Sequence, residues 1–169
     1  MRVLTPEECR AWLLSECGIE VHNPYGYARP EDGKSILSCP RESGRKIALA
    51  RELVCWMGPF SSALLWITDW PFAGTDEMAI VAALRGSHGH RTPLIEAPGH
   101  VFESSEHEEF AGWIALTLWF EWDAHVFQSP FSGTVLHTSH HDEVWITSSR
   151  KEPLAELDIA ARRLDLSVR

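Results

Sequence analysis

The chain has 169 residues and a formal net charge of −9, from 15 lysines and arginines against 24 aspartates and glutamates. Because domains usually have roughly 100–200 residues, this length predicts one domain over residues 1–169. A hydrophobic share of 44% is enough for a packed core and excludes a chain that is disordered throughout. The acidic balance argues against nucleic acid as a partner, since that binding depends on clustered lysine and arginine.

Three further features concern the cellular location. The N-terminus lacks the apolar core of a signal peptide, and the longest apolar stretch, residues 110–122, is shorter than the roughly 20 residues that span a membrane. The four cysteines include no C-x-x-C pair, so neither a zinc knuckle nor a thioredoxin-type redox pair is expected. The sequence therefore predicts a cytoplasmic protein with reduced thiols and no membrane partner.

The predicted elements begin with a helix at Thr5-Pro6-Glu7-Glu8, where Thr5 and Glu8 are spaced for a capping box and Gly18 ends the helix. Ser105 and Glu108 have the same spacing at the start of a later helix. The other segments, in chain order, are a strand at 35–39, a helix at 45–57, a strand at 62–70, a helix at 75–85, extended segments at 94–97 and 100–103, a helix at 105–120, strands at 123–128, 134–139 and 144–148, and a helix from Pro153.

The order of these elements indicates the fold class. Helices and strands alternate only in part, and the last strands are joined by short turns that require antiparallel pairing. We therefore expect a single α+β domain in which helices pack on a largely antiparallel β-sheet.

Eight tryptophans are an unusual number for this length. Five fall on apolar faces of the predicted elements and are expected in the core: Trp12, Trp56, Trp66, Trp113 and Trp119. Trp70, Trp122 and Trp145 lie near predicted strand ends and are candidate contacts for a partner or ligand. Asp123, which follows Trp122, and His100, which follows Pro98-Gly99, are candidate binding or acid–base groups, although a structural role at the turn is favoured for His100.

Histidines suggest a second kind of site. His137, His140 and His141 gather at a predicted hairpin, and His88 and His90 lie in a glycine-containing loop. Imidazole is the commonest nitrogen ligand of zinc, so these five residues are candidate ligands of zinc or another divalent metal. On a regular strand, however, His137 and His140 point to opposite faces, and a solvated polar turn is the favoured interpretation.

The stretch 64–124 contains the apolar run 64–67, the pair Leu84-Arg85, the turn segment 96–102 and the pair Trp122-Asp123. It resembles a group of uncharacterised bacterial proteins that carry a similar apolar strand, a Pro-Gly-His turn and a Trp-Asp pair after an apolar helix. The resemblance implies a bacterial single-domain protein and carries no mechanism.

Phosphate-binding, dinucleotide-binding and nucleophile-elbow signatures are missing from the sequence. The preferred hypothesis is therefore a binding or interaction protein without catalytic activity or cofactor, such as an acidic inhibitor or adaptor of a basic protein. The alternative is a metal-dependent hydrolase that uses a histidine and carboxylate cluster. A third possibility is a protein that binds a small ligand in a tryptophan-lined pocket.

Overall fold

The computed structural model describes residues 1–22, 33–70, 74–149, 161–164 and 166. The predicted final helix from Pro153 falls largely outside these ranges, and residues 161–163 are helical. Within the described ranges, no helix is long and apolar enough to cross a membrane.

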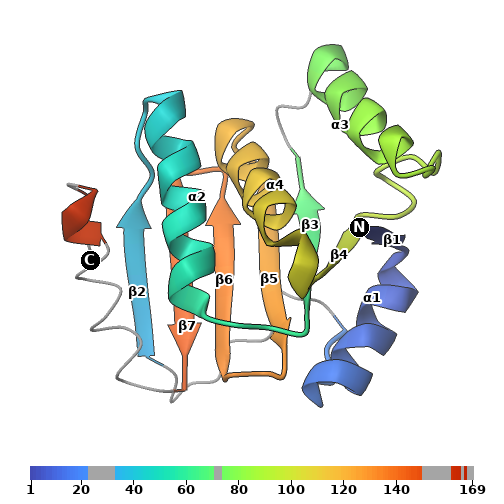
Figure 1. Ribbon diagram of the computed structural model, residues 1–169, viewed down its shortest axis with the longest axis horizontal. Helices are drawn as coiled ribbons and strands as arrows, with labels where there is room; N and C mark the ends of the chain where they lie inside the picture. The colour runs from blue at the N-terminus through green and yellow to red at the C-terminus, as the bar shows by residue number, and fades with distance from the viewer. Residues whose placement is uncertain (23–32, 71–73, 150–160, 165, 167–169) are drawn as a thin grey trace.

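Seven strands form one sheet in the order β1-β4-β3-β5-β6-β7-β2, and all described neighbours pair antiparallel (Figure 1). The strands are β1 (Arg2–Leu4), β2 (Gly33–Ser38), β3 (Ser62–Asp69), β4 (Gly99–Glu103), β5 (Asp123–Ser129), β6 (Thr134–Ser139) and β7 (Glu143–Ser148). The predicted α+β fold with an antiparallel sheet is confirmed. Short turns join β5, β6 and β7, which leaves antiparallel pairing as the only possible arrangement of these neighbours.

Helices cover both faces of the sheet. They are α1 (Pro6–Trp12), which continues into the π-helical turn η1 (Leu13–Cys17), α2 (Ser43–Met57), α3 (Thr75–Ser87), and α4 (His107–Trp119), which follows the 3-10 turn η3 (Ser104–Glu106). In Figure 1, α2 and α4 lie side by side across one face, whereas α3 stands beyond the end of β3.

The core has one apolar layer on each face of the sheet. Between the sheet and the helices α2 and α4, the Phe110 ring packs against Phe60 and Phe102, with ring centroids 5.4 and 5.2 Å apart. On the opposite face, Trp12 and Leu13 pack over the apolar side chains of β3 and β5. Alternate residues of the same strand therefore point into different layers, as expected for a sheet that is buried on both faces.

Three local predictions differ from the structure. Strand β1 was not predicted, because its three residues carry little pattern and are held by pairing with β4. Residues 94–97 were predicted to be extended, but they form a turn in which the Pro93 carbonyl accepts from the Glu96 and Ala97 amides. The capping box before α4 was assigned to the wrong residues, because Glu103 and Glu106 form it one turn earlier. The capping box at Thr5 and Glu8 is confirmed.

Candidate functional site

A group of acidic and imidazole side chains gathers where β3 ends and β5 begins. Asp69 is the last residue of β3, and it lies opposite Asp123, the first residue of β5, in the strand register. The chain reverses after β6, which brings His140 to the same place. Ligand atoms of Asp69, Asp123 and His140 all lie within 4.8 Å of one another, and we call these three residues the Asp/His cluster.

Asp123 organises this cluster through its Oδ1 atom. The backbone N–H of His140 donates to Oδ1 at 2.8 Å, and Nδ1 of the same residue lies 3.0 Å from it. Nε2 of His137 lies 3.8 Å from this oxygen. The expectation that His137 and His140 point to opposite faces applies to a regular strand, and here the turn distorts the chain after Ser139. His140 is the first residue of the turn after β6, and its bond to Asp123 bends the chain back towards the face that carries His137.

A stacked pair of histidines continues the cluster across the sheet. His125 and His137 are cross-strand partners, and their ring centroids are 4.2 Å apart with an interplanar angle of 8°. Burial, and secondarily the neighbouring His137, lowers the pKa of His125 to about 3. Burial also lowers the pKa of His137, although Asp123 opposes this shift. Both rings are therefore neutral near pH 7, which is the form in which imidazole binds a metal.

The other predicted metal ligands lie elsewhere. His88 is at the C-terminal end of α3 and pairs with Glu109 at 2.7 Å. His90 lies 3.4 Å from the carbonyl oxygen of Met1. His141 lies beside His140, with ring centroids 4.1 Å apart. The structure therefore divides the five candidate histidines, and it places only His137, His140 and His141 near Asp123.

The Asp/His cluster has ligand types that suit a divalent metal. Two carboxylates and one imidazole are found as ligands of zinc and of other divalent transition metals. The exposed side chain of Asp69 offers the third ligand atom, within 4.8 Å of those of Asp123 and His140.

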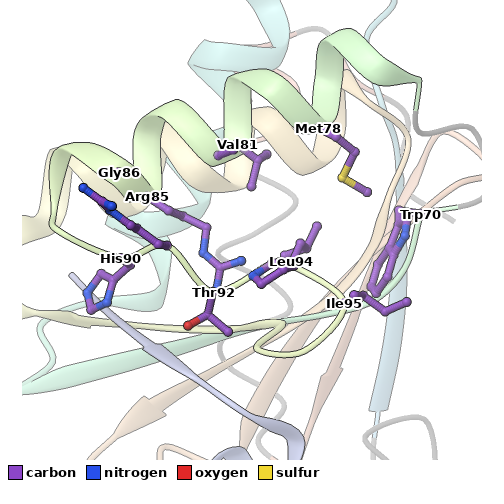
Figure 2. A pocket seen from close by; sticks show the side chains of 12 residues that line it. Trp70, Met78, Val81, Arg85, Gly86, His90, Thr92, Leu94 and Ile95 are labelled. Atoms are coloured by element: carbon purple, nitrogen blue, oxygen red, sulfur yellow. The ribbon is translucent and has the colours of Figure 1, made fainter.

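A pocket of about 640 Å³ lies between α3 and the segment that follows it, and we call it the α3 pocket. Most of its lining is apolar. The lining residues are Trp70, Met78, Val81, Ala82, Arg85, Gly86, His90, Arg91, Thr92, Pro93, Leu94 and Ile95. Figure 2 shows Trp70, Met78 and Ile95 at one end of the pocket, with the Arg85 guanidinium and the His90 ring towards the other. The size and the lining are typical of a small-molecule site.

Arg85 is the polar group deepest in this pocket, with only 1% of its surface exposed. Its Nη2 donates to the carbonyl oxygen of Ala97 at 2.6 Å. Nε and Nη1 are buried and have no hydrogen-bond partner in the described part of the chain. Burial lowers the pKa of Arg85, but a guanidinium keeps its proton in proteins. The pocket therefore contains a buried positive charge whose Nε and Nη1 donors have no acceptor among the described residues.

His100 lies beside this charge on the side of the sheet that faces α4. Its ring is fully buried and stacks on Trp113, with centroids 4.1 Å apart. Burial, together with the nearby Arg85 guanidinium, holds the pKa of His100 well below its ordinary value. His100 is therefore a neutral core residue, and its structural role at the turn after Pro98-Gly99 stays a prediction.

The three candidate indoles have different surroundings. Trp122 is only 1% exposed, so its predicted role as a contact residue is wrong: its ring packs against Phe120 in the core. Trp145 is 39% exposed on β7, next to His137, and Trp70 lines the α3 pocket. Trp119, which was expected in the core, is 49% exposed at the end of α4. Apolar periodicity alone does not show where a helix extends past the sheet that it covers.

Arg85 and Asp69 were not among the site residues predicted from the sequence. Arg85 follows Met78 and Val81 at helical spacing, so it lies on the apolar face of α3, and a cation in that position is the signal that identifies it. The only local signal of Asp69 is its place before Trp70, as an acid beside an indole, and its partner Asp123 is distant in the sequence.

Comparisons with family models, with curated proteins and with solved structures find no match to this chain. The resemblance to a bacterial group, based on the Pro98-Gly99-His100 turn and the Trp122-Asp123 pair, stays a prediction. A functional hypothesis therefore depends on the geometry of the two sites.

Proposed function

We propose that this protein binds a small, mainly apolar molecule in the α3 pocket. The observation that carries this proposal is a pocket of about 640 Å³ with a predominantly apolar lining and few polar groups. Two features support it. The exposed side chain of Ile95 continues the apolar surface to the rim, and Trp70 adds an aromatic surface. The proposal develops the third possibility raised from the sequence, a small ligand in a tryptophan-lined pocket, and differs from the preferred hypothesis of a protein partner.

A pair of substitutions on α3 tests whether the pocket is the binding site. Ala82 lines the pocket and Ala83 does not, although both side chains are exposed on the same helix. We expect octanol or octanoate to bind the parent protein saturably in isothermal titration calorimetry. Ala82→Trp should weaken binding at least tenfold because the indole fills the pocket, whereas Ala83→Trp should leave it unchanged. Binding of neither compound, or equal effects of the two substitutions, would contradict the proposal.

A second candidate function is metal-dependent hydrolysis at the Asp/His cluster. The observation that favours it is the convergence of Asp69, Asp123 and His140 within 4.8 Å. Metal-bound water is a nucleophile near neutral pH, so such a site supports hydrolysis if a substrate reaches it. This candidate follows the sequence-based hypothesis of a histidine and carboxylate cluster. Its set of metal ligands includes Asp69 and excludes His88 and His90.

Metal-dependent hydrolysis requires that the Asp/His cluster binds a metal, and this binding can be measured directly. If it is correct, tag-free, metal-stripped protein should bind one equivalent of Zn²⁺ or Mn²⁺ in calorimetry. Asp69→Asn should weaken that binding at least tenfold, because it removes a charged ligand. Asp76→Asn, a matched change at the start of α3, should have no effect. Absence of stoichiometric binding, or equal affinity in the two variants, would exclude the metal site.

Two sequence-based expectations stay predictions. One is a basic protein partner, and the indoles of Trp119 and Trp145 are among the exposed apolar side chains that such a partner could contact. The other is a cytoplasmic location.

A further inference from the structure

We propose that the ligand of the α3 pocket is an amphipathic monocarboxylate, whose carboxylate pairs with Arg85 and whose apolar part extends towards Trp70 and Met78. This inference rests on the proposed function, because it names the class of ligand that the same pocket takes. Its first support is the state of Arg85. The side chain is 1% exposed, and its Nε and Nη1 atoms have no partner in the described part of the chain.

Such a charge is unfavourable in the ligand-free protein. A buried ion loses its hydration. The free-energy cost of this desolvation is large unless a counter-ion and hydrogen bonds replace the water. The Ala97 carbonyl satisfies one donor of Nη2, and among the described residues no carboxylate forms an ion pair with Arg85. A ligand anion would supply the missing charge and the missing acceptors together.

A carboxylate suits this environment better than a more highly charged anion. A guanidinium presents planar pairs of N–H donors that match the two oxygens of a carboxylate. Among the described residues that line the pocket, Arg85 is the one fully buried cation, since Arg91 is exposed and His90 is partly exposed. One buried positive charge balances one negative charge, whereas a phosphate dianion would retain an uncompensated charge in a mainly apolar site.

The arrangement of the lining indicates an amphipathic ligand. Met78 precedes Arg85 by two turns of α3, which is about 10 Å along the helix axis. Val81 and Leu94 lie between the two ends, and Trp70 and Ile95 close the apolar end (Figure 2). A medium-chain alkyl or arylalkyl carboxylate places its charge at Arg85 and its tail along this surface.

Calorimetry with octanoate and octanamide tests the proposal, because these probes share a tail and differ in charge. We expect octanoate to bind at least tenfold more tightly than octanamide, as charge-assisted hydrogen bonds are the stronger ones. In the series from butyrate to octanoate, affinity should rise roughly fourfold for each methylene. Arg85→Met should abolish the preference for octanoate, whereas Arg85→Lys should keep a reduced preference. Arg41→Met, an exposed arginine outside the pocket, is the control.

The outcomes separate this inference from the proposed function. If octanoate and octanamide bind equally and Arg85→Met changes neither affinity, the carboxylate assignment is overturned and the apolar site stands. If octyl phosphate binds more tightly than octanoate, the anion class is wrong. If none of the probes binds, both proposals fail. Thermal unfolding shows whether Arg85→Met folds, and its midpoint should equal or exceed that of the ligand-free parent, because the change removes a buried charge.

Discussion

Replacing Gly99 by alanine is expected to destabilise the protein by about 3 kcal/mol. Gly99 begins β4, where it pairs with both Leu4 of β1 and Trp66 of β3. A Cβ atom at this position would overlap Cys9 Sγ and lie 3.1 and 3.2 Å from the Cβ and carbonyl oxygen of Leu4. Because Cys9 and Leu4 are themselves buried, neither has room to move. The free energy of unfolding, measured by urea denaturation, tests this expectation.

Two further variants identify the cause. Cys9→Ala removes the overlapping sulfur, so the double variant Cys9→Ala/Gly99→Ala should be more stable than Gly99→Ala alone, with a coupling energy above about 1 kcal/mol. Gly112→Ala makes the same chemical change in α4, where no atom lies within 4 Å of the added carbon. It should stabilise the helix by about 0.5–1 kcal/mol. Additive effects in the double variant would contradict the proposed overlap.

The stability of the protein is also expected to fall in mild acid because of His100. In the unfolded chain this imidazole takes up a proton below about pH 6.5, whereas burial and Arg85 keep it neutral in the folded protein to a much lower pH. The unfolded state then binds more protons, so the free energy of unfolding decreases as the pH falls below 6.5. The contribution of one such histidine is about 1.4 kcal/mol per pH unit. At neutral pH both states are neutral at this residue, and the effect vanishes.

Comparison of two substitutions separates titration from packing. His100→Leu and His100→Asn both remove the titrating group, so each should reduce the slope of unfolding free energy against pH, between about pH 6 and 4.5, by about 1.4 kcal/mol per pH unit. Their absolute stabilities at pH 7 should differ, because the two side chains stack differently on Trp113. If both variants keep the slope of the parent, His100 is not the group that titrates.

The two sites show which site residues local sequence patterns predict and which contacts they do not predict. His140 was a candidate metal ligand and Asp123 a candidate binding or acid–base group. Their contact depends on the bend after β6, which the periodicity of a strand does not predict. Trp70 was a candidate contact residue from its place at a strand end, and it lines the α3 pocket. Trp122 stood in a similar sequence position and is buried, because Phe120 and the α4 layer cover it. Equal local patterns therefore led to opposite exposures.

The sequence by itself determined the α+β class, most of the strands and helices, and the antiparallel pairing of β5, β6 and β7. These features follow from periodicity, caps and short turns, which involve residues that are close in the chain. Only the tertiary structure decided that Asp69 faces Asp123 and that Arg85 is buried in an apolar pocket. Each of these depends on segments that are far apart in sequence, since the burial of a side chain is determined by what packs against it and not by its neighbours along the chain.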